Sequence, residues 1–331
     1  MHIGSIYWLY KREGGKKTLN RNTYMRGLLF ASFGCIGWGI SGVCSQYLFM
    51  EYDMNSAWLT AIRMVFSGII LLIIAMPKEK KRTFKIWTVR KDVLWLLTFA
   101  LLGLLMCQYT FLGAIKYSNS ATATVLQSLN VVIMAVAMAI WTKTRMRISQ
   151  SAAIFLAVLG TYLIAAGGDP DSMTLSGAGL VFGILSAIGV VTYTLLSRSI
   201  IATWGNLLVT GWGMLIGGAV IFITTKAWIV PSNLDLTGWL MITIIVLIGT
   251  AASFSAFLEG VKYIGPVKAT LIGCMEPAAA TALSAIFLGT KFSLFELIGF
   301  CCIVLTVFLS VKENPASRKI RNFSQQSGRN D

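Results

Sequence analysis

One carboxylate stands inside a long apolar stretch of this chain. Glu276 lies in the sequence GCMEPAAAT, residues 273–281, and Pro277 follows it directly. In apolar surroundings a carboxyl group can bind an ammonium group or take up a proton, because desolvation favours its neutral form. Pro277 has no N–H, so the carbonyl of Gly273 loses its helical donor and can face a cavity. The alternative is a neutral carboxyl that hydrogen-bonds between helices or belongs to a packing kink.

A polar stripe occurs in another apolar stretch. Ser120, Thr124, Gln127 and Asn130 follow one another at helical spacing, so they share one face of a helix. Such a face should line a pore rather than meet apolar surroundings. The alternative is interhelical hydrogen bonding, which contributes about 0.6 kcal/mol per contact in membrane proteins.

Further candidates to line a binding cavity are aromatic and polar residues. Trp38 and Ser41 share a helical face, and Tyr193 lies on a comparable face later in the chain. The two aromatic side chains could form a wall that suits an apolar or aromatic solute, or they could simply pack between helices. Gln108 and Ser253 could add polar groups to the same cavity.

Two further charged residues are candidates for a gate or an interface. Arg63 lies roughly 12 Å along its apolar stretch, at 1.5 Å per helical residue. It could pair with a carboxylate solute, but we expect it to extend to the outer membrane interface. Glu259 is close to Lys262 at the end of its stretch, so we expect an interface residue or an inner gate.

The composition is that of a membrane protein. The chain has 331 residues, of which 56% are hydrophobic and 12% charged, and its mean hydropathy is +0.73. Soluble domains carry about 25% charged residues. Apolar stretches of about 20 residues, enough to cross a bilayer as helices, recur along nearly the whole chain. This pattern leaves no room for a soluble domain.

These stretches predict an all-α polytopic fold with ten transmembrane helices. Helices are favoured because each segment must satisfy its own backbone hydrogen bonds in lipid, and the alternation typical of a barrel is absent. The predicted spans are 27–49, 55–76, 92–114, 120–141, 148–166, 177–197, 206–225, 237–258, 266–288 and 293–311.

Several kinds of chemistry are disfavoured by the residues present. All six cysteines fall inside predicted spans, and His2 is the single histidine, so we expect neither a disulfide framework nor a metal site, and no cofactor. The N-terminus lacks the pattern of a cleaved signal peptide. There is no Walker A sequence, so ATP should not drive the protein directly.

The basic residues predict the orientation in the membrane. Most of the 28 lysines and arginines fall on one side when the loops are assigned alternately to two sides. By the positive-inside rule both termini are then cytoplasmic, which requires an even number of spans. The net charge of +15 is thereby explained by topology and by attraction to anionic lipid, and we expect no nucleic-acid partner.

The chain contains an internal repeat. The segment FLGAIKYSNSATATVLQSLN resembles FLEGVKYIGPVKATLIGCME, and at a constant offset Phe111 matches Phe257, and Tyr117 matches Tyr263. The same alignment puts Asn130 opposite Glu276. Two five-helix repeats are therefore predicted at 27–166 and 177–311, between a basic N-terminal segment 1–26, a linker 167–176 and a C-terminal tail 312–331. Five is odd, so the second half should be inverted, as in many secondary transporters.

These features also resemble a known family. Trp38-Gly39 in the first span, Arg63 in the second and the FLxxxKY turn in each half are similar to EamA-type transporters of the drug/metabolite transporter superfamily, over residues 25–312. The resemblance implies a plasma-membrane carrier, commonly an exporter of amino acids or other small metabolites. It also implies a cavity lined by the first, third, fourth, sixth, eighth and ninth spans.

The chain departs from the family pattern at three places. Members often end the fourth and ninth spans with Gly-Glu, whereas this chain has Lys143-Thr144 and Gly289-Thr290. Val131 stands where the first half usually has the proline that matches Pro277. The resemblance therefore does not define the substrate.

The leading hypothesis is a secondary transporter of a small organic solute, driven by an ion gradient or by the solute's own gradient. Protons are a candidate coupling ion, and they would have to use Glu276 or Glu259. Two alternatives stay open. A membrane scaffold or sensor would not need polar residues at the membrane midplane, and an intramembrane enzyme would need a cluster of acids, histidines or metal ligands.

Overall fold

The computed structural model describes residues 21–80, 82–118, 120–142, 148–166, 169, 176–232, 234–288 and 293–312. Every secondary-structure element in these ranges is a helix, which agrees with the predicted all-α class. Several predicted features lie outside the described residues. They are most of the N-terminal segment, the linker and the C-terminal tail, together with Lys143-Thr144 and Gly289-Thr290.

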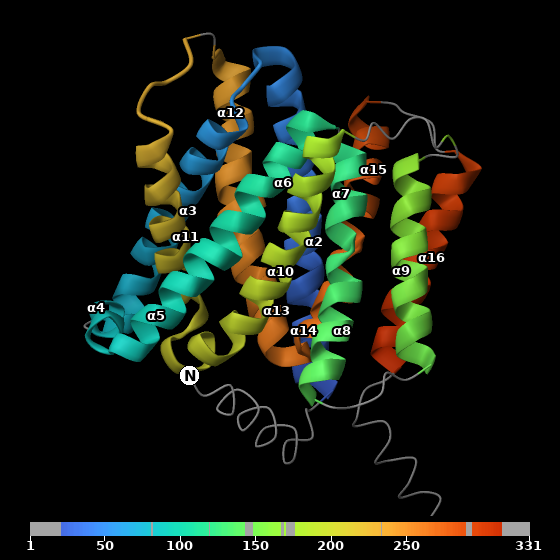
Figure 1. The fold of residues 1–331 in the computed structure, drawn as a ribbon, viewed down its shortest axis with the longest axis horizontal. Coiled ribbons are helices and arrows are strands. Elements are labelled where there is room, and N and C mark those ends of the chain that lie inside the picture. The colour runs from blue at the N-terminus through green and yellow to red at the C-terminus, as the bar shows by residue number, and fades with distance from the viewer. Residues whose placement is uncertain are drawn as a thin grey trace, which may run out of the picture.

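The first half of the chain forms a series of helices, several of which continue directly into one another (Figure 1). Their bounds are α2 Arg21–Tyr52, α3 Ser56–Glu79, α4 Arg82–Lys85, η1 Ile86–Thr88, α5 Arg90–Thr98, η2 Phe99–Leu105, α6 Met106–Tyr117, α7 Ser120–Ser128, α8 Asn130–Thr142 and α9 Ile148–Ala166.

The second half repeats this order of long, interrupted helices. Their bounds are α10 Gly177–Trp204, α11 Asn206–Thr224, α12 Leu236–Ile244, η4 Ile245–Ala252, α13 Ser253–Ile264, α14 Pro266–Gly273, α15 Met275–Leu288 and α16 Leu294–Lys312.

Seven helices in the described residues are long and apolar enough to cross a membrane. They are Asn22–Tyr52, Ser56–Pro77, Arg90–Tyr117, Ala123–Trp141, Gly177–Trp204, Asn206–Thr224 and Leu236–Ile264. The predicted spans 148–166, 266–288 and 293–311 also lie on helices, namely α9, α14 with α15, and α16. The chain is thus a multi-pass membrane protein, while the count of ten spans stays a prediction.

The helices begin and end where local chemistry favours it. Asn55 caps α3 by accepting a hydrogen bond from Ala57 N at 2.8 Å, and Asp235 caps α12 by accepting one from Gly238 N at 2.8 Å. Gly205 and Gly265 have φ angles of 88° and 83°, a conformation that favours glycine. These two glycines turn the chain between α10 and α11 and between α13 and α14.

The two halves are interrupted at matching places. Residues 99–105 and 245–252 form π-helical segments, which correspond under the offset of the sequence repeat. A second pair of interruptions lies at Leu129, between α7 and α8, and at Cys274, between α14 and α15. Within a membrane, non-helical backbone is tolerated where it is buried in protein or lines a cavity. The interruptions therefore indicate where a cavity should be sought.

Close helix packing surrounds this region. α2 packs against α13, α14 and α15, while α3 packs along α11 and α10 along α6. α9 and α16 pack together at one side of the bundle (Figure 1). Glycines allow the closest approaches: Gly68 meets α11, and Gly189 meets the backbone of Cys107 on α6.

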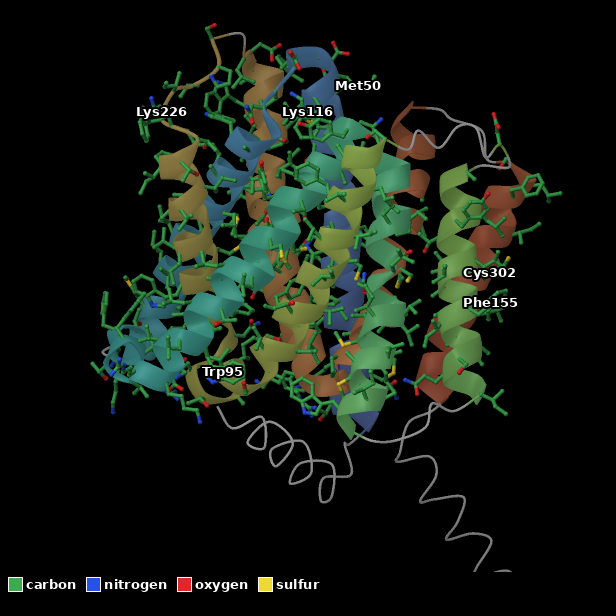
Figure 2. The ribbon with its side chains drawn as sticks, viewed as in Figure 1. Met50, Trp95, Lys116, Phe155, Lys226 and Cys302 are labelled. Atoms are coloured by element: carbon green, nitrogen blue, oxygen red, sulfur yellow. The ribbon has the colours of Figure 1, made fainter. Side chains whose placement is uncertain are left out.

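The two ends of the bundle differ in the residues they carry. Lys116 and Lys226 lie at one end, and Trp95 lies at the other (Figure 2). Lys116 forms an ion pair of 3.5 Å with Asp53 at its end. When the loops are assigned alternately to two sides, the sparsely charged side is expected to hold Lys116, Lys226 and Lys291; the first two share one end, and Lys291 lies outside the described residues. Which end faces the cytoplasm stays a prediction.

The packing of α3 against α11 leads to a test of stability. Gly68→Ala should lower the thermal unfolding temperature of the detergent-purified protein, because the added Cβ would lie 2.6 Å from Leu215 N and 2.9 Å from Gly211 O. These backbone atoms cannot rotate away, and such overpacking costs about 1–3 kcal/mol. Gly177→Ala is the matched control, since a Cβ there meets nothing within 4 Å. Equal unfolding temperatures for the two variants would contradict this close packing.

Candidate functional site

A cavity lies among the interrupted helices. It is bordered by α2, α3, α6, α7, α8, α10, α13, α14 and α15, so both halves of the chain contribute to it. Its lining residues are Trp38, Ser41, Arg63, Cys107, Gln108, Phe111, Thr124, Gln127, Ser128, Asn130, Val190, Tyr193, Phe254, Phe257, Thr270, Gly273, Cys274, Glu276 and Pro277. The structure thus brings together seven of the residues singled out as binding candidates: Trp38, Ser41, Gln108, Gln127, Asn130, Tyr193 and Glu276.

Glu276 lies in the first turn of α15, directly after the interruption at Cys274. Its side chain is 8% exposed and makes no hydrogen bond or ion pair with any described residue. The N-terminal end of a helix favours negative charge, because its N–H dipoles point toward it. Glu276 is therefore a buried carboxyl group that the cavity leaves available to a bound group.

The interruptions leave main-chain carbonyls available to the cavity. Pro277 has no N–H to donate to Gly273 O, and both residues line the cavity. At the matching place in the first half, Asn130 Nδ2 donates to Gln127 O at 2.6 Å. The two equivalent carbonyls therefore differ: Gly273 O receives no hydrogen bond from Pro277, whereas Gln127 O accepts one from the side chain of Asn130. Asn130 Oδ1 is buried and has no hydrogen-bond partner among the described residues.

Gln127 connects three helices beside the cavity. Its Nε2 donates to Ser186 Oγ at 2.6 Å, and Ser186 Oγ donates to Cys107 O at 3.4 Å. These contacts join α7, α10 and α6, so the interhelical hydrogen bonding that was the alternative for the polar stripe is present. Gln127 and Thr124 also line the cavity. The side chain of Ser120 lies outside the described residues.

An aromatic wall closes one side of the cavity. The ring of Trp38 lies 4.9 Å from Phe254 and 4.8 Å from Phe257, and Tyr193 lies 5.7 Å from Phe254. Trp38 Nε1 is buried without a hydrogen-bond partner among the described residues. The two predicted aromatic residues therefore pack against other rings and also border the cavity. A wall of this kind suits the apolar part of a solute.

The expected position of Arg63 was wrong. Arg63 does not extend to the interface: it is 4% exposed, lines the cavity, and donates from Nε to Gln108 Oε1 at 2.6 Å. Gln108 on α6 provides a buried acceptor that holds the guanidinium inside the bundle. The sequence showed the depth of Arg63 but not that its helix turns it toward α6.

Ser253 and Glu259 lie outside the cavity lining. Ser253 Oγ donates to Ile248 O at 2.7 Å, and a Cβ at Gly37 would come 2.0 Å from this hydroxyl oxygen. Ser253 is thus a packing residue between α13 and α2, and the expectation that it lines the cavity was wrong. Glu259 pairs with Lys262 at 3.0 Å near the end of α13. This contact suits the interface role expected for it.

Sequence reasoning missed several lining residues. Nothing in the sequence marks Phe254 and Cys107 as cavity-lining residues, because apolar residues are common in every span. Phe111 and Phe257 occupy matching positions of the repeat, and both line the cavity. The repeat could have identified them as candidates. No group of three or more histidine, cysteine or acidic residues that could hold a metal ion occurs among the described residues.

The role of Asn130 at the interruption can be tested. Asn130→Leu should lower the thermal unfolding temperature, because it leaves Gln127 O without the side-chain donor in a buried setting, a loss of about 1–3 kcal/mol. Gln46→Leu is the control, since the one hydrogen bond of the Gln46 amide to a described residue is the weak one to Met50 Sδ at 3.9 Å. The Asn130 bond is unimportant if both variants unfold at the same temperature in a detergent melting assay.

Comparison with solved structures supports the arrangement of helices. The chain is similar to a protein of known crystal structure with a TM-score of 0.65 and 16% sequence identity, over 87% of this chain and 94% of that one. At this identity the likeness concerns the fold alone.

Comparison with related sequences and with a family model defines the family. The uncharacterized inner membrane transporter YicL of Salmonella typhimurium is 37% identical over 288 residues, which is 86% of this chain and 94% of that protein. An uncharacterized transporter of Clostridium kluyveri is 20% identical over 312 residues, 91% of this chain and 98% of that protein. The model of the EamA-like transporter family matches the chain twice, at residues 25–166 and 177–312. The chain therefore belongs to the EamA-like transporter family, as its sequence motifs indicated.

Proposed function

We propose that this protein is a secondary transporter that carries a small organic metabolite, an amino acid or a related solute, by alternating access between two halves. The observation that carries the proposal is the cavity between the halves, where Glu276 is buried without a hydrogen-bond or ion-pair partner among the described residues. An intramembrane carboxyl group is costly to bury, so its presence beside a cavity favours a role in binding.

The proposed architecture is ten helices in two inverted five-helix repeats, 27–166 and 177–311. Three observations support it. The family model matches each half separately, the π-helical segments lie at matching positions, and so do the interruptions near Asn130 and Glu276. Five spans per half would reverse the orientation of the second half, which suits rocking of the two halves about a central site.

The proposed setting is the plasma membrane, with both termini in the cytoplasm and export as the direction of transport. The asymmetric distribution of lysine and arginine supports the orientation. Export rests on the family resemblance. Transport against the solute's own gradient needs a driving force, and a proton gradient acting through Glu276 would supply it.

Glu276 is proposed to bind either a coupling proton or an ammonium group of the solute. Arg63 acts on Glu276 electrostatically, and Tyr193 and the cysteines 35, 107 and 274 are titratable groups on which Glu276 acts in turn. Arg63 is the one cation among them. Proton uptake by Glu276 would therefore change the net charge of the cavity by one unit, which is how a proton can be coupled to solute binding.

The transport proposal is tested by reconstitution. The full chain is placed in liposomes, and the flux of amino acids, amines and aromatic metabolites is measured with and without a proton gradient. We expect flux of at least one solute class above that of protein-free liposomes. Folded protein that moves none of these classes would contradict the transporter proposal.

The role of Glu276 is tested by Glu276→Gln, which keeps the shape of the side chain but removes its charge and its titratable proton. Gradient-driven flux of the solute identified above should fall at least tenfold, or its dependence on the proton gradient should disappear. Glu51→Gln is the control, because Glu51 is exposed at the end of α2. Wild-type flux between pH 5 and pH 9 in the Glu276 variant would rule out the role assigned to this carboxyl group.

A further inference from the structure

The guanidinium group of Arg63 is only partly used by the protein. Its Nε donates to Gln108 Oε1 at 2.6 Å, and this is the one hydrogen bond it makes with the described residues. An arginine side chain carries five N–H donors, of which four lie on the terminal amino groups. Within the part of the chain that the structure describes, these terminal groups have no hydrogen-bond partner, and they are not enclosed as Trp38 Nε1 is. They are therefore available to the cavity that Arg63 lines.

Gln108 fixes the direction in which the guanidinium group points. Gln108 is 1% exposed, and its own amide nitrogen lies against Met214 Sδ of α11. Arg63 is 4% exposed, so both side chains are held by their surroundings and not by solvent. With Nε bound to Gln108, the free edge of the guanidinium fork is the one formed by its terminal amino groups. Gln108 is thus a positioning residue for Arg63.

Arg63 and Glu276 line the same cavity but form no salt bridge with each other. A buried charge without a close partner is costly, and pairing with a charged group offsets that cost. The cavity is electrically neutral when Glu276 is ionised and positive when Glu276 is protonated. Since arginine keeps its charge in either case, the cavity is never net negative. When Glu276 is protonated, the net positive charge disfavours organic cations and favours carboxylates, and when Glu276 is ionised the net charge favours neither.

The chemistry that fits this arrangement is a carboxylate. The terminal amino groups of a guanidinium match the two oxygens of a carboxylate in a bidentate, charge-assisted pair. The aromatic rings of Trp38, Phe254 and Phe257 border the same cavity and can contact an apolar body attached to that carboxylate. An ammonium group on the same molecule would have Glu276 as its partner, while an organic acid without one would leave Glu276 free to take a proton.

We infer that Arg63, held by Gln108, is the residue that binds the carboxylate of the solute and that it selects carboxylate-bearing solutes against organic cations. This inference rests on the proposed transport function and defines the chemical class of its substrate. It differs from the expectation that Arg63 would lie at the membrane interface.

The inference is tested by equilibrium binding to the detergent-purified full chain, measured by calorimetry. The probes share a phenyl body: 3-phenylpropionate as an acid, phenylalanine as a zwitterion, and phenylalanine amide and phenethylamine as cations. At least one of the two carboxylates should bind at least tenfold more tightly than either cation. The comparison of 3-phenylpropionate with phenylalanine then distinguishes an organic acid from a zwitterion as the preferred solute.

Two variants assign the preference to Arg63. Arg63→Gln should weaken carboxylate binding at least tenfold and leave the cations unchanged or improved. Gln108→Glu retains Arg63 but places a carboxylate against its Nε, so carboxylate probes should again weaken at least tenfold while cations strengthen. Gln46→Glu makes the same change on α2 outside the cavity lining and should bind all four probes as the wild type does. Gln108→Glu keeps the test valid if Arg63→Gln fails to fold.

Several outcomes would overturn the inference. They are cations that bind the wild type as tightly as the carboxylates, carboxylate affinity unchanged in both variants, and folded wild-type protein that binds neither carboxylate. Because binding is measured without flux, its result is independent of transport. Selective carboxylate binding without flux would contradict the transporter proposal alone, and flux of cations that persists in Arg63→Gln would contradict this inference alone.

Discussion

The need to satisfy main-chain polar groups inside a bilayer constrains the whole molecule. Continuous helices meet that need by themselves, and a helix can be interrupted only where another partner or a cavity replaces the missing hydrogen bond. In this chain the interruptions at Leu129 and Cys274 and the two π-helical segments all belong to helices that border one cavity. The irregular backbone and the cavity therefore occur together, because the main-chain groups left unpaired by the interruptions need a cavity or another partner.

The two halves meet this constraint with different residues. Pro277 removes a donor in the second half, and Glu276, just before it, lies in the first turn of the helix that begins after Cys274. In the first half, where Val131 replaces the proline, the side chain of Asn130 donates to the equivalent carbonyl, that of Gln127. One side of the cavity is consequently acidic and the other carries a neutral amide. A symmetric backbone therefore presents an asymmetric set of binding groups.

The charges in the cavity form the second determinant of its chemistry. Arg63 and Glu276 come from different halves of the chain and face the same space without contact. Their separation leaves both available to a solute, whereas a salt bridge between them would have satisfied both and closed the site. Gln108 contributes by holding Nε of Arg63, so the guanidinium is positioned without its charge being neutralised.

Periodicity along the chain was sufficient to predict much of this protein. The apolar stretches located the long helices but not the short ones at Arg82–Lys85 and Ile86–Thr88, and the repeat paired Asn130 with Glu276, which lie at matching interruptions. The polar stripe with Gln127 was also found, because residues on one helical face share their surroundings whatever packs against them. The helical faces depend on neighbours three or four residues apart, and the repeat is visible when the two halves of the chain are aligned, so the sequence by itself determined these features.

Tertiary structure decided which neighbour each face meets. Arg63 turns inward because Gln108, on another helix, offers a buried acceptor, and Ser253 packs against Gly37 instead of lining the cavity. Phe254 becomes part of the aromatic wall only through its contact with Trp38. The physical reason is that the rotation of a helix about its axis is set by packing between helices, and residues distant in the sequence control that packing.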